Sequence, residues 1–335
     1  MTDYMYPRKW RVLVSSSAST RQIVDQGSNT RKVESAIDVS KLKCTFSIKK
    51  NYQRQNIGVI SVYNLAPDLE AQLIAEGDRV IIEAGYENLI MTGENKGQYG
   101  EPKLYGKIYD GSIIKFAKRK ENNTERVLTL LCQDADYPLN MAFISQSYSR
   151  GLTAREAVNR ICSDSTIPIP VGALSESLNT VPLPRGKAVF GAPKDYLDSI
   201  AKGNAAQVWT DGEIINVTRI TDPNLDEAIV LTPTSGLIGS PEQVPYGVNF
   251  KCFLRPDLKF RGLVKIQGAE IAGLQSADPN QTPLDPENIY QISDITYVGD
   301  TWGSDWYCQI EGISRYGKSA LPMLVDSVLA DPNRK

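Results

Sequence analysis

Residues 77–85 read Gly-Asp-Arg-Val-Ile-Ile-Glu-Ala-Gly, and residues 261–268 read Arg-Gly-Leu-Val-Lys-Ile-Gln-Gly. Each stretch follows a segment of the form Leu-x-Pro-Asp-Leu, at residues 65–69 and 254–258. Apolar and β-branched residues recur in these stretches, which predicts strands.

Further counterparts keep the same order along the chain. Residues 105–108 match 290–292, and residues 131–133 match 307–309. A preserved order predicts two copies of one β module in a single polypeptide. Chance similarity between β-rich segments is the competing explanation.

The segment between the two β regions has a different character. Thr153 and Glu156 form a capping-box pattern that predicts a helix over 154–164. Pro193 and Gly203 delimit a second predicted helix, and Asp211-Gly212 predicts a hairpin over 207–218. The prolines between 168 and 184 predict a loop.

The sequence therefore predicts a mainly β fold with a small α+β insert. Two β-barrel or sandwich domains, at 1–149 and 235–320, flank a mixed middle domain at 150–234. Residues 321–335 are expected to form an exposed tail. The local signals add a short helix at 68–76 and a hairpin turn at 121–124.

Composition is that of a soluble globular protein, with 335 residues, 41% hydrophobic residues and 23% charged residues. No apolar run reaches the roughly 18 residues that a membrane helix needs. The N-terminus lacks the basic and apolar pattern of a secretory signal, so folding in a cytoplasm is expected. The five cysteines are at least 30 residues apart, which favours buried thiols over a metal or redox site.

The chain contains no histidine. That excludes Ser-His-Asp and Cys-His nucleophiles and the HExxH zinc site, and it favours a protein that is not an enzyme and needs no cofactor. Carboxylate-only hydrolysis remains an alternative. Its candidate pairs are Asp134 with Asp136, Asp222 with Asp226, and Asp300 with Asp305, all near turns where Asp commonly caps backbone groups.

Charge is unevenly distributed. Residues 1–60 hold 11 Lys and Arg against 4 Asp and Glu, although the whole chain carries a formal charge of −2. A solvated strand face explains this excess, and so does a docking surface for an acidic neighbour. A pI near 5.5 argues against specific nucleic-acid binding.

Two further clusters have more than one explanation. Trp302, Trp306, Tyr297 and Tyr307 suit a core or subunit contact, with sugar stacking as the alternative. The basic residues 115–120 suit a solvated hairpin end or a contact with a neighbouring subunit, with phosphate binding as the alternative.

Residues 62–65 (Val-Tyr-Asn-Leu), 77–86 and 104–108 (Leu-Tyr-Gly-Lys-Ile) resemble the first β domain of tailed-phage baseplate hub proteins of the late-control-D type. In that family an Asn-Leu strand end precedes a Gly-Asp, apolar strand, Ala-Gly-Tyr unit and a Gly-x-Ile strand. The resemblance covers most of residues 10–316, with the capped helix and the hairpin in place of the family's mixed middle region.

The resemblance implies a structural hub at the baseplate or tail tip of a virion, assembled in the host cytoplasm. Family members form a homotrimer whose six tube-like domains make a pseudo-sixfold ring around a channel. This ring adapts the sixfold tail tube or distal tail protein to a threefold spike or tip protein. Tape measure and baseplate wedge proteins are further implied partners. No specific nucleic-acid binding is expected, although DNA would pass through the channel, and no membrane partner is expected.

The predicted contact residues are Lys41, Lys43, Lys49, Lys50, Tyr86, Tyr99, Lys118, Arg119 and Trp302. Loops 87–103 and 271–288 are expected to clasp neighbours. The alternative function is a receptor- or glycan-binding β protein of the tail tip, which would use exposed aromatic residues.

Overall fold

The computed structural model describes residues 8–15, 36–51, 55–76, 79–87, 104–121, 124–135, 137–179, 182–219, 222, 227–244, 247–272 and 287–314. Within these ranges no helix is long and apolar enough to cross a membrane. Tyr99, loop residues 88–103 and 273–286, and the tail 321–335 lie outside the described residues.

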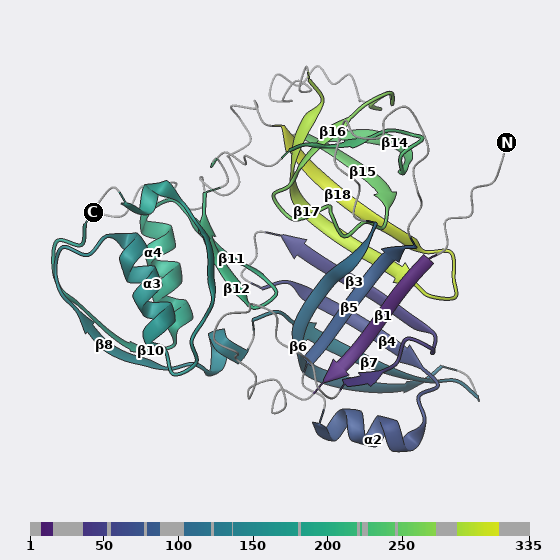
Figure 1. Cartoon of the computed structure of the whole chain (residues 1–335), viewed down its shortest axis with the longest axis horizontal. Helices are drawn as coiled ribbons and strands as arrows, with labels where there is room; N and C mark the ends of the chain where they lie inside the picture. The colour runs from purple at the N-terminus through teal and green to yellow at the C-terminus, as the bar shows by residue number, and fades with distance from the viewer. Residues whose placement is uncertain are drawn as a thin grey trace, which may run out of the picture.

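The first module is an antiparallel sheet with one helix beside it (Figure 1). Its strand order is β3-β4-β7-β6-β5-β1-β2. The predicted helix after Pro67 and the hairpin between β6 and β7 are confirmed. The elements are β1 (Arg8–Ser15), β2 (Ala36–Asp38), β3 (Cys44–Asn51), β4 (Ile57–Tyr63), α2 (Pro67–Glu76), β5 (Arg79–Tyr86), β6 (Tyr105–Lys120) and β7 (Arg126–Gln133).

The second module repeats this strand order. It runs β14-β15-β18-β17-β16-β13, which corresponds strand for strand to β3-β4-β7-β6-β5-β1. One pairing differs, because β13 lies parallel to β16 whereas β1 lies antiparallel to β5. The elements are β13 (Ile229–Leu231), β14 (Leu237–Val244), β15 (Gly247–Phe253), β16 (Leu263–Ile266), β17 (Ile289–Asp300) and β18 (Trp306–Ser314).

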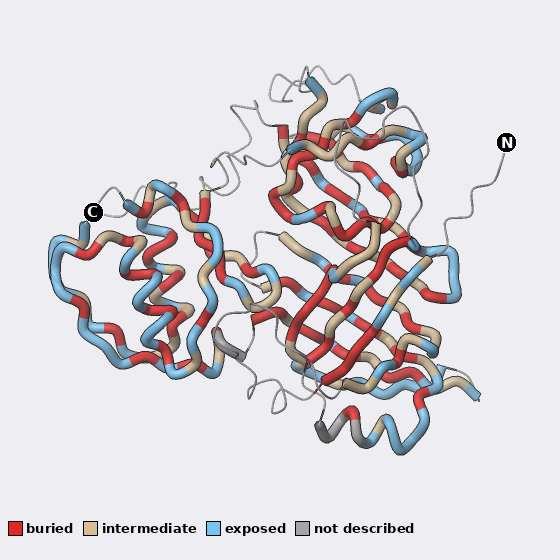
Figure 2. The backbone as a smooth tube through the Cα atoms, viewed as in Figure 1, coloured by how far each residue is buried: buried red, intermediate tan, exposed pale blue. Residues whose placement is uncertain are grey.

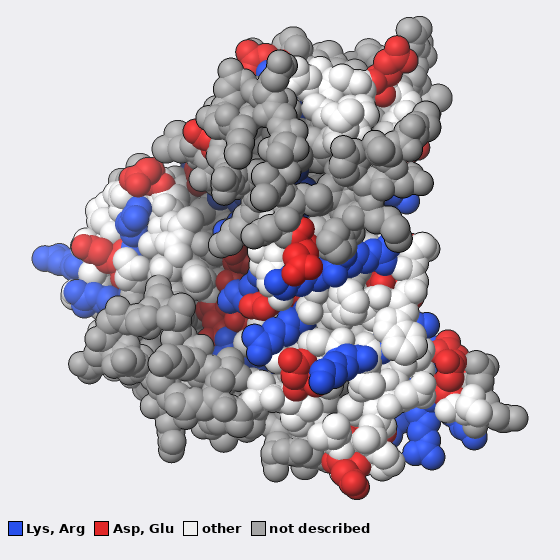
Figure 3. All heavy atoms as spheres, turned by 45° about the vertical axis from the view of Figure 1, so that its right-hand side comes forward, with Lys and Arg blue, Asp and Glu red and all other residues white. Residues whose placement is uncertain are grey.

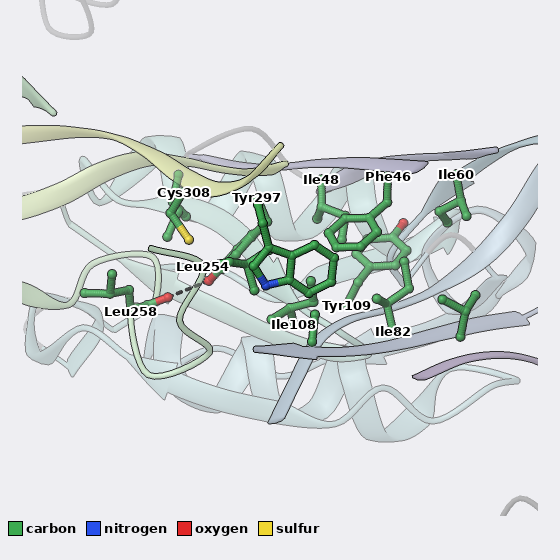
Figure 4. Close-up of a cluster of buried hydrophobic side chains, with 14 of the residues drawn as sticks. Phe46, Ile48, Ile60, Ile82, Ile108, Tyr109, Leu254, Leu258, Tyr297 and Cys308 are labelled. Carbon is green, nitrogen blue, oxygen red and sulfur yellow. Dashed lines mark hydrogen bonds between the residues drawn. The ribbon is translucent and has the colours of Figure 1, made fainter. Parts of the chain in front are cut away.

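A seam between β17 and β3 joins the modules into one 13-stranded sheet. It runs antiparallel from the Asp294–Asn51 pair to the Asp300–Thr45 pair. Both modules also contribute to one hydrophobic core, in which Tyr297 lies near Phe46 and Ile48 (Figure 4). The hydroxyl of Tyr297 donates to the carbonyl of Leu258, so this buried polar group is satisfied.

The middle unit, residues 137–219, has a separate core between its two helices and its short strands (Figure 2). Helices α3 and α4 begin and end as predicted, and both hydrogen bonds of the capping box at Thr153 and Glu156 are present. The elements are η1 (Tyr137–Met141), β8 (Ile144–Tyr148), α3 (Ala154–Asp164), β9 (Val171–Leu174), η2 (Glu176–Asn179), β10 (Lys187–Gly191), α4 (Pro193–Gly203), β11 (Gln207–Asp211) and β12 (Ile214–Thr218).

The prediction of a continuous loop between Pro168 and Pro184 is wrong. That stretch contains strand β9 and the 3-10 turn η2. Strand β9 lies parallel to β12, and it fits between Pro170 and Pro182 because neither proline removes a donor from its own residues. The fold is mainly β with a small mixed insert, as the sequence predicts.

All five cysteines are buried and free, as the sequence predicts. Burial raises the pKa of the Cys44, Cys132 and Cys162 thiols to about 12. Thiols with so high a pKa remain protonated and unreactive at neutral pH.

Candidate interaction surfaces and module junctions

The turn between β17 and β18 is fastened to the first module. Arg8, in β1, donates from its guanidinium to the carbonyls of Gly303 and Ser304, at 2.5 and 2.9 Å. The same guanidinium carbon lies 5.5 Å from the ring centroid of Trp306, a cation–π distance. Arg8 therefore links the β17–β18 turn of the second module to the first module, in addition to the seam between β17 and β3.

Trp306, at the start of β18, lies buried between the two modules, with only 3% of its surface exposed. Its ring meets Trp10 and Phe46 edge-on, at centroid distances of 6.0 and 5.6 Å. Its indole Nε1 donates to the carbonyl of Gly85 at 3.3 Å. The indole is therefore anchored at both its apolar body and its polar edge.

Close packing at the seam also requires a glycine. A Cβ on Gly299 would lie 2.2 Å from the ring of Phe46, which faces it across the seam. Tyr86 is buried nearby, where its hydroxyl donates to the carbonyl of Trp306 at 3.4 Å and its ring contacts Phe253. Burial raises the pKa of Tyr86, so this phenol stays protonated.

A second junction ties the middle unit to the first module through Asp134, which follows β7 and is 1% exposed. Its carboxylate accepts from the Asn56 backbone N–H at 2.6 Å, the Asn56 Nδ2 at 2.7 Å and the Thr210 hydroxyl at 2.6 Å. Asn56 Nδ2 donates in addition to the carbonyl of Thr210 at 2.7 Å. Burial raises the pKa of Asp134 to about 7, against the opposing effect of these donors.

The hairpin of β11 and β12 contacts both modules. Lys50 of the first module donates to Asp211 at 2.9 Å. Trp209 meets Phe260 of the second module edge-on, at a centroid distance of 5.0 Å.

The carboxyl group of Asp134 has a structural role, because its hydrogen bonds from Asn56 and Thr210 join the first module to the middle unit. No group of three or more His, Cys, Asp or Glu in the described ranges could hold a metal ion.

The predicted basic contact residues mostly have partners within the chain. Their partners are Tyr63 for Lys43 (4.5 Å to the ring), Asp294 for Lys49 (3.1 Å), Asp211 for Lys50, Glu70 for Lys118 (2.5 Å) and Glu121 for Arg119 (3.3 Å). Figure 3 shows basic and acidic side chains lying next to one another on one face of the molecule. Lys41 is exposed in the turn before β3.

The four residues of the predicted aromatic cluster differ in how far they are buried. Trp306 and Tyr297 are buried, Tyr307 is half-buried beside Lys251, and Trp302 is 70% exposed at the turn. Asp300 fixes this turn by accepting from the backbone N–H groups of Trp302 and Gly303. Trp302 is therefore held out on an ordered turn of the second module.

Sequence reasoning missed an exposed apolar patch on the middle unit. The rings of Phe143 and Phe190 meet edge-on at 5.0 Å, and Phe190 and nearby Met141 are 73% and 66% exposed. Large apolar side chains in residues 141–143 and in the short strand at 187–191 were the available signal. They did not show which way each side chain would point.

The model of the baseplate hub gp41 family matches residues 32–269, well over half of the chain. The chain belongs to the baseplate hub gp41 family. This baseplate hub protein is thus a structural component of a phage tail, and the predicted resemblance to baseplate hub proteins is confirmed.

Two solved structures of tail proteins share the fold of this hub protein. The 43 kDa tail protein of prophage MuSo2 from Shewanella oneidensis aligns with a TM-score of 0.54 at 8% identity, covering 92% of this chain and 97% of that one. A tail protein from Neisseria meningitidis MC58 aligns with a TM-score of 0.53 at 9% identity, covering 94% and 99%.

A chain of the Francisella PdpA–VgrG complex, half-lidded, aligns with a TM-score of 0.51 at 7% identity, covering 92% of this chain and 58% of that one. No curated protein matches the sequence. At these identities the likeness to solved structures concerns the fold alone.

Proposed function

We propose that three copies of this hub protein close into a ring around a central channel. The observation that carries this proposal is the matching strand order of the two modules, joined by the seam into one sheet. Two similar modules in each of three chains present six similar units, so a threefold assembly offers a pseudo-sixfold face.

In this role the ring adapts one symmetry to another. Its two modules meet the sixfold tail tube or the distal tail protein. The middle unit has no second copy within the described residues and therefore gives the ring a threefold face for a spike or tip protein. The role is one of assembly in the virion baseplate, and it involves no substrate turnover.

Two exposed residues support contacts with neighbours. Trp302 is held on a fixed turn and Lys41 on the turn before β3, so both are available for partners outside the chain. Lys49, Lys118 and Arg119 would contact partners by exchanging their present carboxylate partners, whereas the Lys50 side chain is only 13% exposed in its pair with Asp211 and keeps that partner. Such exchange is cheap for exposed pairs, because they contribute little to stability.

The test is the mass and shape of the purified full-length chain. Light scattering at micromolar concentration should give three times the chain mass of 37.0 kDa, and electron-microscopy class averages should show a threefold ring with a central opening. A stable monomer, or an open filament instead of a closed ring, would contradict the proposal.

A further inference from the structure

The two modules share a β-bulge at equivalent positions. In β6, Ile113 faces Cys132 and Lys115 faces Leu131, which leaves Ile114 as the extra residue. In β17, Ile292 faces Gly312 and Asp294 faces Glu311, which leaves Ser293 as the extra residue. Bulges bend a strand and redirect its pairing.

Both strands pair with an equivalent neighbour before the bulge. The last pair in the first module is Ser112 with Arg79, and the last in the second is Gln291 with Leu263. Ser112 also faces Gln133, just as Gln291 also faces Ile313. The two bulges therefore occupy the same place in the same strand of the repeat.

Beyond the bulge the two strands differ. Residues 294–300 of β17 turn to β3 and form the seam. Residues 115–120 of β6 pair with β7 on one side, and none of the strands that the structure describes pairs with them on the other. Most of these β6 side chains are exposed. An open edge of this kind presents backbone donors and acceptors for another strand.

The strand equivalent to β3 in the second module is β14, at the far end of the large sheet. Its outer edge carries a single described bridge, in which Gln243 N–H donates to the Ala272 carbonyl and Ala272 N–H donates to the Pro241 carbonyl, both at 2.8 Å. Covering an edge with a short segment protects it from indiscriminate pairing.

We propose that β6 of one copy pairs antiparallel with β14 of the next copy, displacing the Ala272 bridge, as β17 pairs with β3 within one chain. The proposal rests on the ring proposed above and names the strands that close it. The intrachain seam and the interchain seam then alternate around the ring, three of each.

The repeat also gives the register. In each module one row of four residues runs across four neighbouring strands. The row in the first module is Lys115, Leu131, Val59 and Ser47, and the equivalent row in the second is Asp294, Glu311, Asn249 and Glu242. Glu242 thus takes the place of Ser47, which faces Val298 in the seam. Val298 lies four residues after Asp294, and Arg119 lies four after Lys115. Arg119 should therefore face Glu242 of the next copy.

The charges fit this register. The intrachain seam already carries an ion pair across its two strands, between Lys49 and Asp294 at 3.1 Å. In the interchain seam the basic strand would be β6, and the carboxylate would come from Glu242 of β14. Arg119 is available for this contact because its present partner, Glu121, forms an exposed pair at 3.3 Å.

Charge reversal tests the pairing. Arg119→Glu or Glu242→Arg alone should raise the concentration at which half the chains are trimeric by about tenfold or more, because like charges then face each other at every interface. The double variant should return to within about threefold of the wild type. Lys202→Glu, a reversal at an exposed residue of α4, should leave this concentration unchanged.

Disulfide trapping tests the register independently of charge. Equivalence with Thr296 and Lys49 places Ala117 opposite Val244 of the next copy. Ala117→Cys with Val244→Cys should give covalent dimers and trimers on a non-reducing gel. Ala117→Cys with Gln243→Cys should not, because neighbouring residues of a strand point to opposite faces. The native cysteines are all buried.

The outcomes separate the two proposals. A trimeric ring whose assembly concentration is unchanged by both charge reversals, or that shows no register-specific cross-link, overturns the strand pairing. The proposed function would then still stand. A wild-type chain that remains monomeric overturns the ring and the pairing together.

Discussion

Trp302 and Trp306 lie at the two ends of one turn, and their surroundings assign them different roles. Trp306→Ala removes a buried indole from the junction of the modules, so the unfolding free energy should fall by about 3–5 kcal/mol. Trp302→Ala removes an exposed side chain and should change it by no more than about 0.5 kcal/mol. Urea denaturation followed by circular dichroism compares the two, and equal losses would contradict the proposed anchoring role of Trp306.

Asp134 is a buried carboxyl group at the junction between the middle unit and the first module. Its pKa is raised to about 7 in the folded chain, from an ordinary value of 3.8. The folded state therefore binds more protons than the unfolded state between these pH values. Its contribution to stability is fully present below about pH 4 and is lost as pH rises through 7.

Asp134→Asn should remove this pH dependence. The free energy of unfolding of the wild type, relative to that of the variant, should fall by up to about 1.4 kcal/mol per pH unit as the pH rises from 5 to 7. Parallel urea titrations at several pH values measure it. Asp164→Asn, at an exposed residue of α3, serves as the control. A difference that stays flat with pH would show that Asp134 is ionised throughout.

At the scale of elements, local chemistry made the two helices and the β11–β12 hairpin of the middle unit predictable. Thr153 and Glu156 satisfy each other's backbone N–H groups, and Asp211-Gly212 supplies a turn with Gly212 at positive φ. Both signals act within four residues, so neither depends on the rest of the chain. The helices and the hairpin therefore begin and end where the sequence predicts.

Pairings between distant segments were harder to predict. Strand β9 forms between prolines because β12, some 40 residues later, pairs with it in parallel. The sequence also aligned Cys132 with Cys308, whereas strand pairing makes Cys132 equivalent to Gly312. A shift of four residues keeps the same side chains facing inward, so hydrophobic alternation alone cannot detect it.

The contacts at the module junctions were also not predictable from local sequence patterns. The sequence indicated an excess of positive charge before residue 60 but did not reveal that Lys49 and Lys50 have carboxylate partners more than 150 residues away. The clamp of Arg8 on Gly303 and Ser304 depends on nearly the whole chain being folded. Such contacts follow from tertiary structure, and no local pattern encodes them.

At the scale of the whole molecule, one core serves both modules. Side chains from β3, β4 and β6 pack with side chains from β15, β17 and β18. The two modules therefore share one core within a single chain. In the proposed ring, three interfaces form between copies in place of six, which lowers the entropy lost on closing the ring.

The size of the ring follows from the proposed strand pairing. Each module contributes four strands between seams, and six such units with strands about 4.8 Å apart and tilted by about 40° close at a backbone diameter of about 45–50 Å. A cryo-electron-microscopy reconstruction measures this diameter directly. The section through the large sheet should show six similar units, and the section through the middle units should show three. Copies that meet only through side chains would leave gaps between strand edges and a wider ring, because each sheet edge would then stand farther from the next than the hydrogen-bonded strand spacing of about 4.8 Å.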